Sequence, residues 1–112
     1  MALYLPLFPA LVDETGVWVL AVGKANDPEQ VRVDPYLGAQ LGDVVKLILQ
    51  TAAREWSHQQ PAAQNAATVF DIPKADFIDG LVAGPAAKLK YTITQSSGKS
   101  ETSLDLEFEL RD

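Results

Sequence analysis

The last quarter of the chain alternates strictly between apolar and polar side chains, and this two-residue period constrains the fold more than any other feature. The apolar positions of its two segments are Leu89, Tyr91 and Ile93, then Leu104, Leu106, Phe108 and Leu110. Because successive side chains of a strand point to opposite faces, each segment has one apolar face and one solvated face. The pattern predicts an antiparallel β-hairpin over a core, with a Ser-Ser-Gly-Lys turn between its strands.

Length and composition place the chain among soluble globular domains. Its 112 residues suit a single domain covering residues 1–112, with 47% hydrophobic and 21% charged side chains. The net charge of −6 repels phosphate backbones and anionic lipids, so we expect no nucleic-acid partner. The chain has no cysteine, which removes disulfides and thiolate metal sites and leaves the redox compartment open.

The N-terminal stretch is apolar but does not have the form of a targeting signal. It lacks a basic leading region, is interrupted by Pro6 and Pro9, and is too short to span a bilayer. We therefore expect no signal peptide and no membrane insertion. Localisation stays open, with a cell-surface or secreted location if the domain belongs to a larger chain and the cytoplasm otherwise.

Short runs of β-branched and aromatic residues indicate further strands at residues 17–22, 31–33 and 68–72. Residues 3–12 are typical of an extended edge segment, because their prolines cannot donate ladder hydrogen bonds. Residues 57–67 are polar and small and predict an exposed loop. Residues 74–80 predict a single helical turn, after which residues 80–87 turn the chain into the closing hairpin.

Residues 43–56 allow two secondary structures. Their apolar side chains fall at helical spacing behind Asp43 as a candidate N-cap, and periodicity alone favours an amphipathic helix. The same stretch also fits a strand over residues 44–51, with Val45, Leu47 and Leu49 on one face. The strand gives an all-β fold, whereas the helix gives an α+β fold with one helix across an antiparallel sheet.

Five short motifs between residues 31 and 110 carry a family resemblance. They are Tyr36-Leu37-Gly38, Gly42-Asp43-Val44-Val45, Phe70-Asp71-Ile72-Pro73-Lys74-Ala75-Asp76, Lys90-Tyr91-Thr92-Ile93-Thr94 and Ser103-Leu104. Together they resemble immunoglobulin-like domains that occur as tandem modules in large bacterial surface and secreted proteins. The resemblance implies an all-β, immunoglobulin-like antiparallel β-sandwich in which residues 44–51 form a strand. It also implies a non-catalytic binding, adhesion or spacer module of a bacterial protein.

The sequence contains none of the motifs that carry a named chemistry. Glycine-rich phosphate loops, a serine nucleophile in its glycine-flanked turn and paired catalytic carboxylates at recognisable spacing are missing. Carboxylates gather at Asp71, Asp76 and Asp79, but without the ligand pattern of a calcium loop, so we expect solvated or capping roles for them. We predict no enzyme activity, no cofactor and no metal.

The residues we single out for ligand or partner contact are Trp56, His58, Gln59 and Gln60. Trp56 borders the polar stretch and is expected to be more exposed than Trp18, and an exposed tryptophan can stack on a sugar ring. The partner is then a protein or a glycan, and a carbohydrate-binding module is one alternative function. Another alternative is a small self-associating structural protein, a homo-oligomer in which residues 3–12 add a strand to a neighbour.

Overall fold

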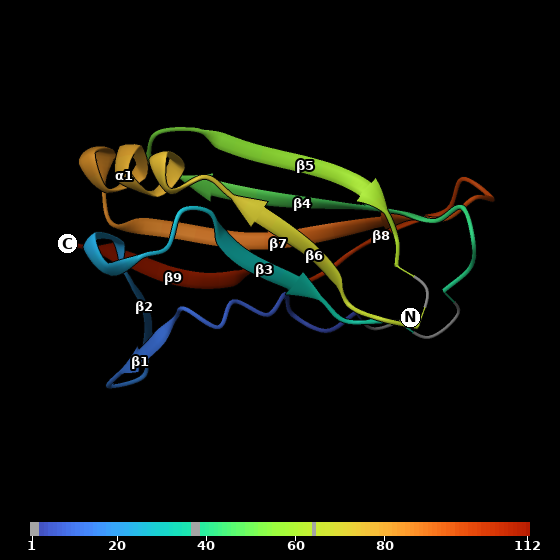
Figure 1. The fold of residues 1–112 in the computed structure, drawn as a ribbon, viewed down its shortest axis with the longest axis horizontal. Helices are drawn as coiled ribbons and strands as arrows, with labels where there is room; N and C mark the ends of the chain where they lie inside the picture. The colour runs from blue at the N-terminus through green and yellow to red at the C-terminus, as the bar shows by residue number, and fades with distance from the viewer. Residues whose placement is uncertain (1–2, 37–38, 64) are drawn as a thin grey trace.

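The computed structural model describes residues 3–36, 39–63 and 65–112, which form two stacked β-sheets with one α-helix at one end (Figure 1). The molecule is elongated, with principal extents of 42 × 26 × 20 Å. This mostly-β, two-layer arrangement agrees with the β-sandwich architecture expected from the sequence. Leu37 and Gly38 of the first family-like motif, and residue 64 of the expected loop, lie outside the described residues.

The larger sheet contains seven strands. Its order is β1 (Val12–Glu14), β2 (Val17–Ala21), β9 (Leu106–Arg111), β7 (Ala86–Thr94), β4 (Val44–Thr51) and β5 (Glu55–Pro61), and β8 (Ser100–Thr102) pairs with the far half of β7. β2 and β9 run parallel, and the other neighbours are antiparallel. The sheet therefore brings the second strand of the chain beside the last one.

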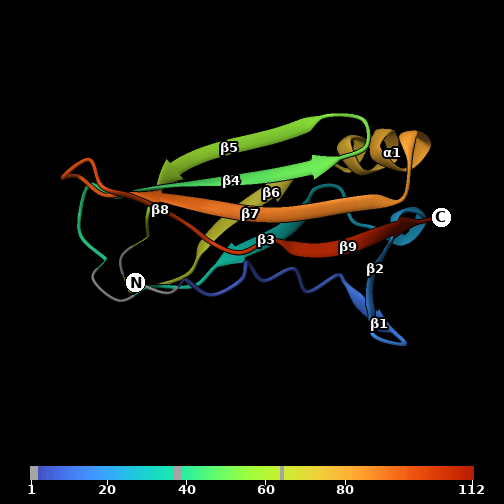
Figure 2. The same cartoon turned by 180° about the vertical axis from the view of Figure 1, so that it is seen from behind.

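The smaller sheet pairs β3 (Glu29–Val33) with β6 (Thr68–Ile72) in antiparallel register. The N-terminal segment extends this layer, because the backbone groups of Leu7 and Arg32 bond to each other in both directions at 2.8 Å. The short helix η1 (Val22–Lys24) and the helix α1 (Lys74–Ala83) lie at the end of the molecule where the C-terminus emerges (Figures 1 and 2).

The core lies between the two sheets and consists of alternate residues of their strands. The buried positions of β4, β7 and β9 are Val45, Leu47 and Leu49, then Ala87, Leu89, Tyr91 and Ile93, then Leu106, Phe108 and Leu110. The alternation predicted for residues 89–93 and 106–110 is thereby confirmed. The strand over residues 44–51 is also confirmed, and the helix over residues 43–56 is wrong: β4 pairs with β7 along its whole length.

The final alternating segment is not one continuous strand. The pattern predicts Leu104 on the apolar face, but this side chain is 78% exposed. The backbone leaves the ladder between β8 and β9, and Ser103 bridges the gap. Its N–H donates to the Tyr91 carbonyl at 2.9 Å, and its hydroxyl accepts from the Tyr91 N–H at 3.0 Å. The phase of the alternation shifts across this break, which a strict period cannot predict.

Two other expectations are wrong. The loop expected from residue 57 begins later, because residues 55–61 form β5 and pair with β4 from Glu55 to Pro61. The helix α1 is ten residues long rather than a single turn, and it occupies the first part of the turn expected over residues 80–87. Pro73 precedes the helix and Gly84 follows it, so both ends carry residues that suit helix boundaries.

Candidate functional site

The predicted contact residues lie on β5, which is an edge strand of the larger sheet. Trp56, His58 and Gln60 lie opposite buried residues of β4, so their side chains point to the core side of the sheet. Gln59 alternates to the outer face. The structure therefore brings three of the four predicted residues together and separates the fourth from them.

These three side chains close the sandwich along the edge between β5 and β6. The His58 ring centroid lies 6.4 Å from that of Trp56 and 6.3 Å from that of Phe70 on β6. The Gln60 amide donates a hydrogen bond to the Val69 carbonyl, also on β6. The contacts tie one sheet to the other, and Trp56 is partly buried against the core. These contacts fit a structural role for the three side chains better than an open binding surface.

Trp18 is the more exposed tryptophan, so the expected order of the two is wrong. It is 46% exposed and stands on the β1–β2 hairpin, all of whose residues from Val12 to Trp18 are exposed. The hairpin turns at Thr15 and Gly16, whose φ angles of 52° and 89° lie in the left-handed region. β2 pairs with β9 only over residues 19–21, so Trp18 lies beyond the part of β2 that pairs with β9 and pairs only with Asp13 of β1.

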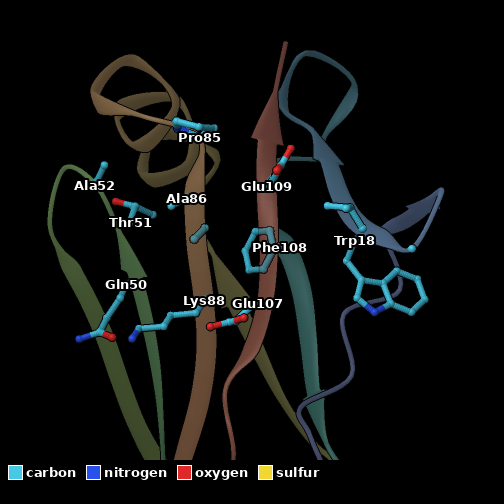
Figure 3. Close-up of a pocket in the computed structure, with 13 residues that line it drawn as sticks. Trp18, Gln50, Thr51, Ala52, Pro85, Ala86, Lys88, Glu107, Phe108 and Glu109 are labelled. Carbon is cyan, nitrogen blue, oxygen red and sulfur yellow. The ribbon is translucent and has the colours of Figure 1, made fainter.

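A groove of about 690 Å³ lies on the outer face of the larger sheet beside this hairpin (Figure 3). Its floor is the start of β7, where Pro85 and Ala86 present little side-chain bulk. Trp18 stands on one side of β9, and Gln50 and Ala52 at the end of β4 stand on the other side. The volume is within the range that holds small-molecule ligands in proteins.

Polar side chains cross this groove in one row. Gln50 on β4 is the register partner of Lys88 on β7, and Lys88 is the partner of Glu107 on β9. Their side chains point out from the same face of the sheet (Figure 3). Two residues further along β9, Glu109 accepts a hydrogen bond from Arg111 at 2.9 Å. The row offers an amide, an ammonium and a carboxylate to anything that lies across the strands.

Sequence reasoning missed this groove. The run of residues 17–22 predicts a buried strand, which is right for Val19 and Leu20 and wrong for Trp18. The one sequence signal that could have indicated the groove is the turn dipeptide Thr15-Gly16 between two short β-forming stretches. It predicts a hairpin, and a hairpin that extends beyond the sheet can form one side of a groove. The row of polar residues follows from register, which the sequence does not specify.

Asp43 is the most strongly held carboxylate among the described residues. It is 1% exposed, and its oxygens accept hydrogen bonds from the Tyr36 hydroxyl, the Gln40 N–H and the Ser96 N–H. The Tyr36 hydrogen bond, with those from the backbone, lowers the pKa of Asp43 against the effect of burial, and burial beside this carboxylate raises the pKa of Tyr36. The expected role of Asp43 as a helix N-cap is wrong, since it precedes β4 and anchors two loops.

Other acidic side chains are paired or solvated. The Arg54 guanidinium bonds both Asp76 at 3.0 Å and Asp79 at 2.8 Å, and Asp71 is exposed. Within residues 3–36, 39–63 and 65–112, no group of three or more His, Asp and Glu side chains is placed to hold a metal ion. In the same ranges, none of the helices has the length and apolar character needed to cross a membrane.

The chain is therefore a mostly-β domain of two sheets, with an open groove on the outer face of the larger sheet. Comparisons with models of protein families, with curated proteins and with solved structures find no match.

Proposed function

We propose that this chain is an immunoglobulin-like β-sandwich that serves as a non-catalytic binding, adhesion or spacer module of a larger bacterial protein. The strand order supports the fold. If β3, β4, β5, β6, β7 and β9 are taken as strands B, C, C′, E, F and G, the pair β3–β6 corresponds to B–E, and the order β9-β7-β4-β5 corresponds to G-F-C-C′. Both pairings are those of immunoglobulin domains.

The placement of the chain ends is the observation that carries the spacer function. The first described residues lie toward one end of the long axis, and the C-terminus lies at the opposite end (Figures 1 and 2). A chain that enters toward one end and leaves at the opposite end adds most of its 42 Å length to any array in which it is repeated. A domain whose ends lay together would add little reach and would branch from the array instead.

The alternative of strand exchange between copies is less favoured by the geometry. Phe8 of the N-terminal segment is buried between Phe77 and Phe108 of the same chain, at 5.7 Å from each ring. An exchanged segment would have to give up these contacts and remake them in a neighbour.

Small-angle X-ray scattering of two copies joined end to end tests the spacer function. We expect a maximum dimension of roughly twice the single-module length, because the joining point lies on the long axis. A maximum dimension close to that of a single module would overturn the proposal.

A further inference from the structure

We propose that the free edge of β5 pairs in antiparallel register with the same edge of a second copy of this chain. β5 is the last strand of the larger sheet, and no other element of the described chain lies along its outer side (Figures 1 and 2). Its inward side chains close the sandwich, but the backbone edge away from β4 stays open. The inference goes beyond the proposed function, because it depends on this edge and not on the role of the module in an array.

Two hydrogen bonds fix which backbone groups of β5 face outward. Before the strand, the Thr51 N–H donates to the Arg54 carbonyl at 3.0 Å. After the strand, the Ala62 N–H donates to the Asp43 carbonyl at 2.9 Å. The register with β4 is continuous between these points, so hydrogen-bonded and non-bonded pairs alternate along it. The residues whose N–H and C=O groups face away from β4 are therefore Glu55, Ser57 and Gln59.

The edge lacks the features that usually keep edge strands apart. Natural proteins block such edges with lysines, bulges, short strands or a covering segment. β5 has seven residues, pairs with β4 without a bulge and contains no lysine, and Glu55 is its single charged residue. Among the described strands that end a sheet path or leave one side unpaired, β1 and β8 have three residues and β6 has five. β5 therefore offers the longest free edge of the described chain.

The sequence of β5 matches a second copy of itself. Hydrogen-bonded antiparallel pairs need outward-facing residues on both strands. With a twofold axis at Ser57, this residue lies opposite Ser57 of the second copy, and Glu55 lies opposite Gln59 of the second copy. This is the one antiparallel register that pairs all three outward residues of each strand, because a shift by one pair brings in Pro61, which has no N–H, or residue 53, which precedes the strand.

Charge and side-chain type also favour this register. The Glu55 carboxylate, which already accepts from the Gln50 amide at 3.1 Å, meets a neutral amide instead of a second carboxylate. On the core side, Trp56 lies opposite His58 of the second copy. Aromatic cross-strand pairs of this kind stabilise neighbouring strands, whereas like charges in direct opposition destabilise them.

The pairing is weak between free copies. One strand edge is a small contact compared with the roughly 1,200 Å² at which specific, stable interfaces begin. Each copy also carries a net charge of −6, and like-charged copies repel each other. We therefore expect monomers at micromolar concentration and edge pairing at millimolar concentration, which the clustering of modules on large proteins supplies locally.

Disulfide cross-linking of single-cysteine variants tests the inference, because the chain has no cysteine of its own. At about 1 mM protein, Ser57→Cys should link to itself roughly tenfold faster than Ser97→Cys, since pairing raises the effective concentration of the thiols. Directly opposed residues have Cα atoms about 5.5 Å apart, which suits a disulfide. Ser97→Cys is the matched control, an exposed serine in the turn between β7 and β8.

A mixture of two further variants checks the register. Glu55→Cys and Gln59→Cys should link to each other when mixed. Each alone should link slowly, because its own counterpart lies four residues out of register, about 13 Å away along the strand. Adding Ser57→Lys to both should slow the mixed reaction at least roughly fivefold, since two lysines then oppose each other. Ser57→Lys also reduces the negative charge of each copy, so slower linking does not come from general repulsion.

Three results would overturn the inference: equal rates for Ser57→Cys and Ser97→Cys, equal rates for the mixed and separate variants, and no effect of Ser57→Lys. The spacer function keeps a separate test when the joined copies carry Ser57→Lys, which stops them from folding back on each other through β5. Failed cross-linking with a doubled maximum dimension would remove the edge pairing and leave the spacer. Specific cross-linking with a single-module dimension would do the reverse.

Discussion

At the scale of single residues, Asp43 shows how a buried charge can hold a loop-rich end of a sandwich. Its carboxylate receives three hydrogen bonds, from Tyr36 and Gln40 on the chain before it and from Ser96 in the turn between β7 and β8. Its carbonyl also accepts from the Ala62 N–H at 2.9 Å. Hydrogen bonds to a charged acceptor are stronger than those between neutral groups, so this one side chain ties the segment before β4 to the turn between β7 and β8.

Asp43→Asn should destabilise the domain by about 2 to 3 kcal/mol at pH 7, because an amide is a weaker acceptor and adds two donors that face other donors. The loss should depend on pH. The folded-state pKa of Asp43 is lowered, so its contribution is fully present above the unfolded value of about 4 and is lost as pH falls through the folded pKa. Urea unfolding from pH 7 to pH 2 measures this, and the gap between variant and parent should narrow below about pH 4.

The control for this experiment is Asp105→Asn, which removes an exposed carboxylate 3.8 Å from Lys88. A pair of this kind contributes about 0 to 1 kcal/mol, so its variant should track the parent across the pH range. An Asp43→Asn variant that lost the same free energy at pH 2 and pH 7 would contradict the assignment of a charged, low-pKa carboxylate.

At the scale of elements, α1 depends on one glycine to approach the larger sheet. A Cβ added at Gly80 would lie 2.8 Å from the Thr51 Cβ on β4 and 2.9 Å from the Leu110 Cδ1 on β9. Phe77, one turn earlier, is fully buried. Close approach at Gly80 is therefore what allows Phe77 to reach the core between the two sheets.

Gly80→Ala should destabilise the domain by about 1 to 2 kcal/mol, although alanine is the better helix former by about 1 kcal/mol, because overpacking against a strand typically costs more. Urea unfolding measures the change. The control is Val82→Ala on the exposed side of the same helix, where the side chain is 84% exposed and the effect should be within about 0.5 kcal/mol. A stabilised Gly80→Ala variant would show that α1 can move away from β4 at little cost.

The same scale shows what the sequence could predict. Two-residue alternation identified β7 and most of β9, because a strand that is buried on one face has apolar residues at every second position. Residues 44–51 fit two periods at once, and only pairing with β7 and β5 on both sides decides for the strand. β5 was missed because Ser57, His58 and Gln59 have little strand propensity of their own, and their backbone is held by the neighbouring strand instead.

The candidate site was less predictable than the fold. His58 was expected in an exposed loop, but its ring lies against Phe70, which belongs to another strand of the opposite sheet. Trp18 was expected in the core, because its neighbours Val19 and Leu20 are apolar and buried. Exposure at the groove depends on where β2 leaves β9, and no residue type marks that point.

At the scale of the whole molecule, residues 3–21 join the two layers. The N-terminal segment bonds to β3 of the smaller sheet at Leu7, and β2 then pairs with β9 of the larger sheet. Between these points Phe8 enters the core. Before Leu7, the Tyr4 carbonyl accepts a hydrogen bond from the Tyr91 hydroxyl of β7. The segment is part of the packed domain rather than an arm beside it, and this distinction can be tested.

Phe8→Ala should lower the free energy of unfolding by about 3 to 5 kcal/mol, because it removes a buried ring that contacts Phe77 and Phe108 and leaves a cavity. Tyr4→Ala is the matched control, since its side chain is 77% exposed and only its backbone carbonyl is used.

Urea unfolding at two protein concentrations, with sedimentation velocity, separates the two arrangements of the segment. If the segment packs on its own chain, the unfolding midpoint is independent of concentration for both variants and for the parent. If copies exchange the segment, the parent sediments as a dimer, its midpoint rises with concentration, and Phe8→Ala dissociates it.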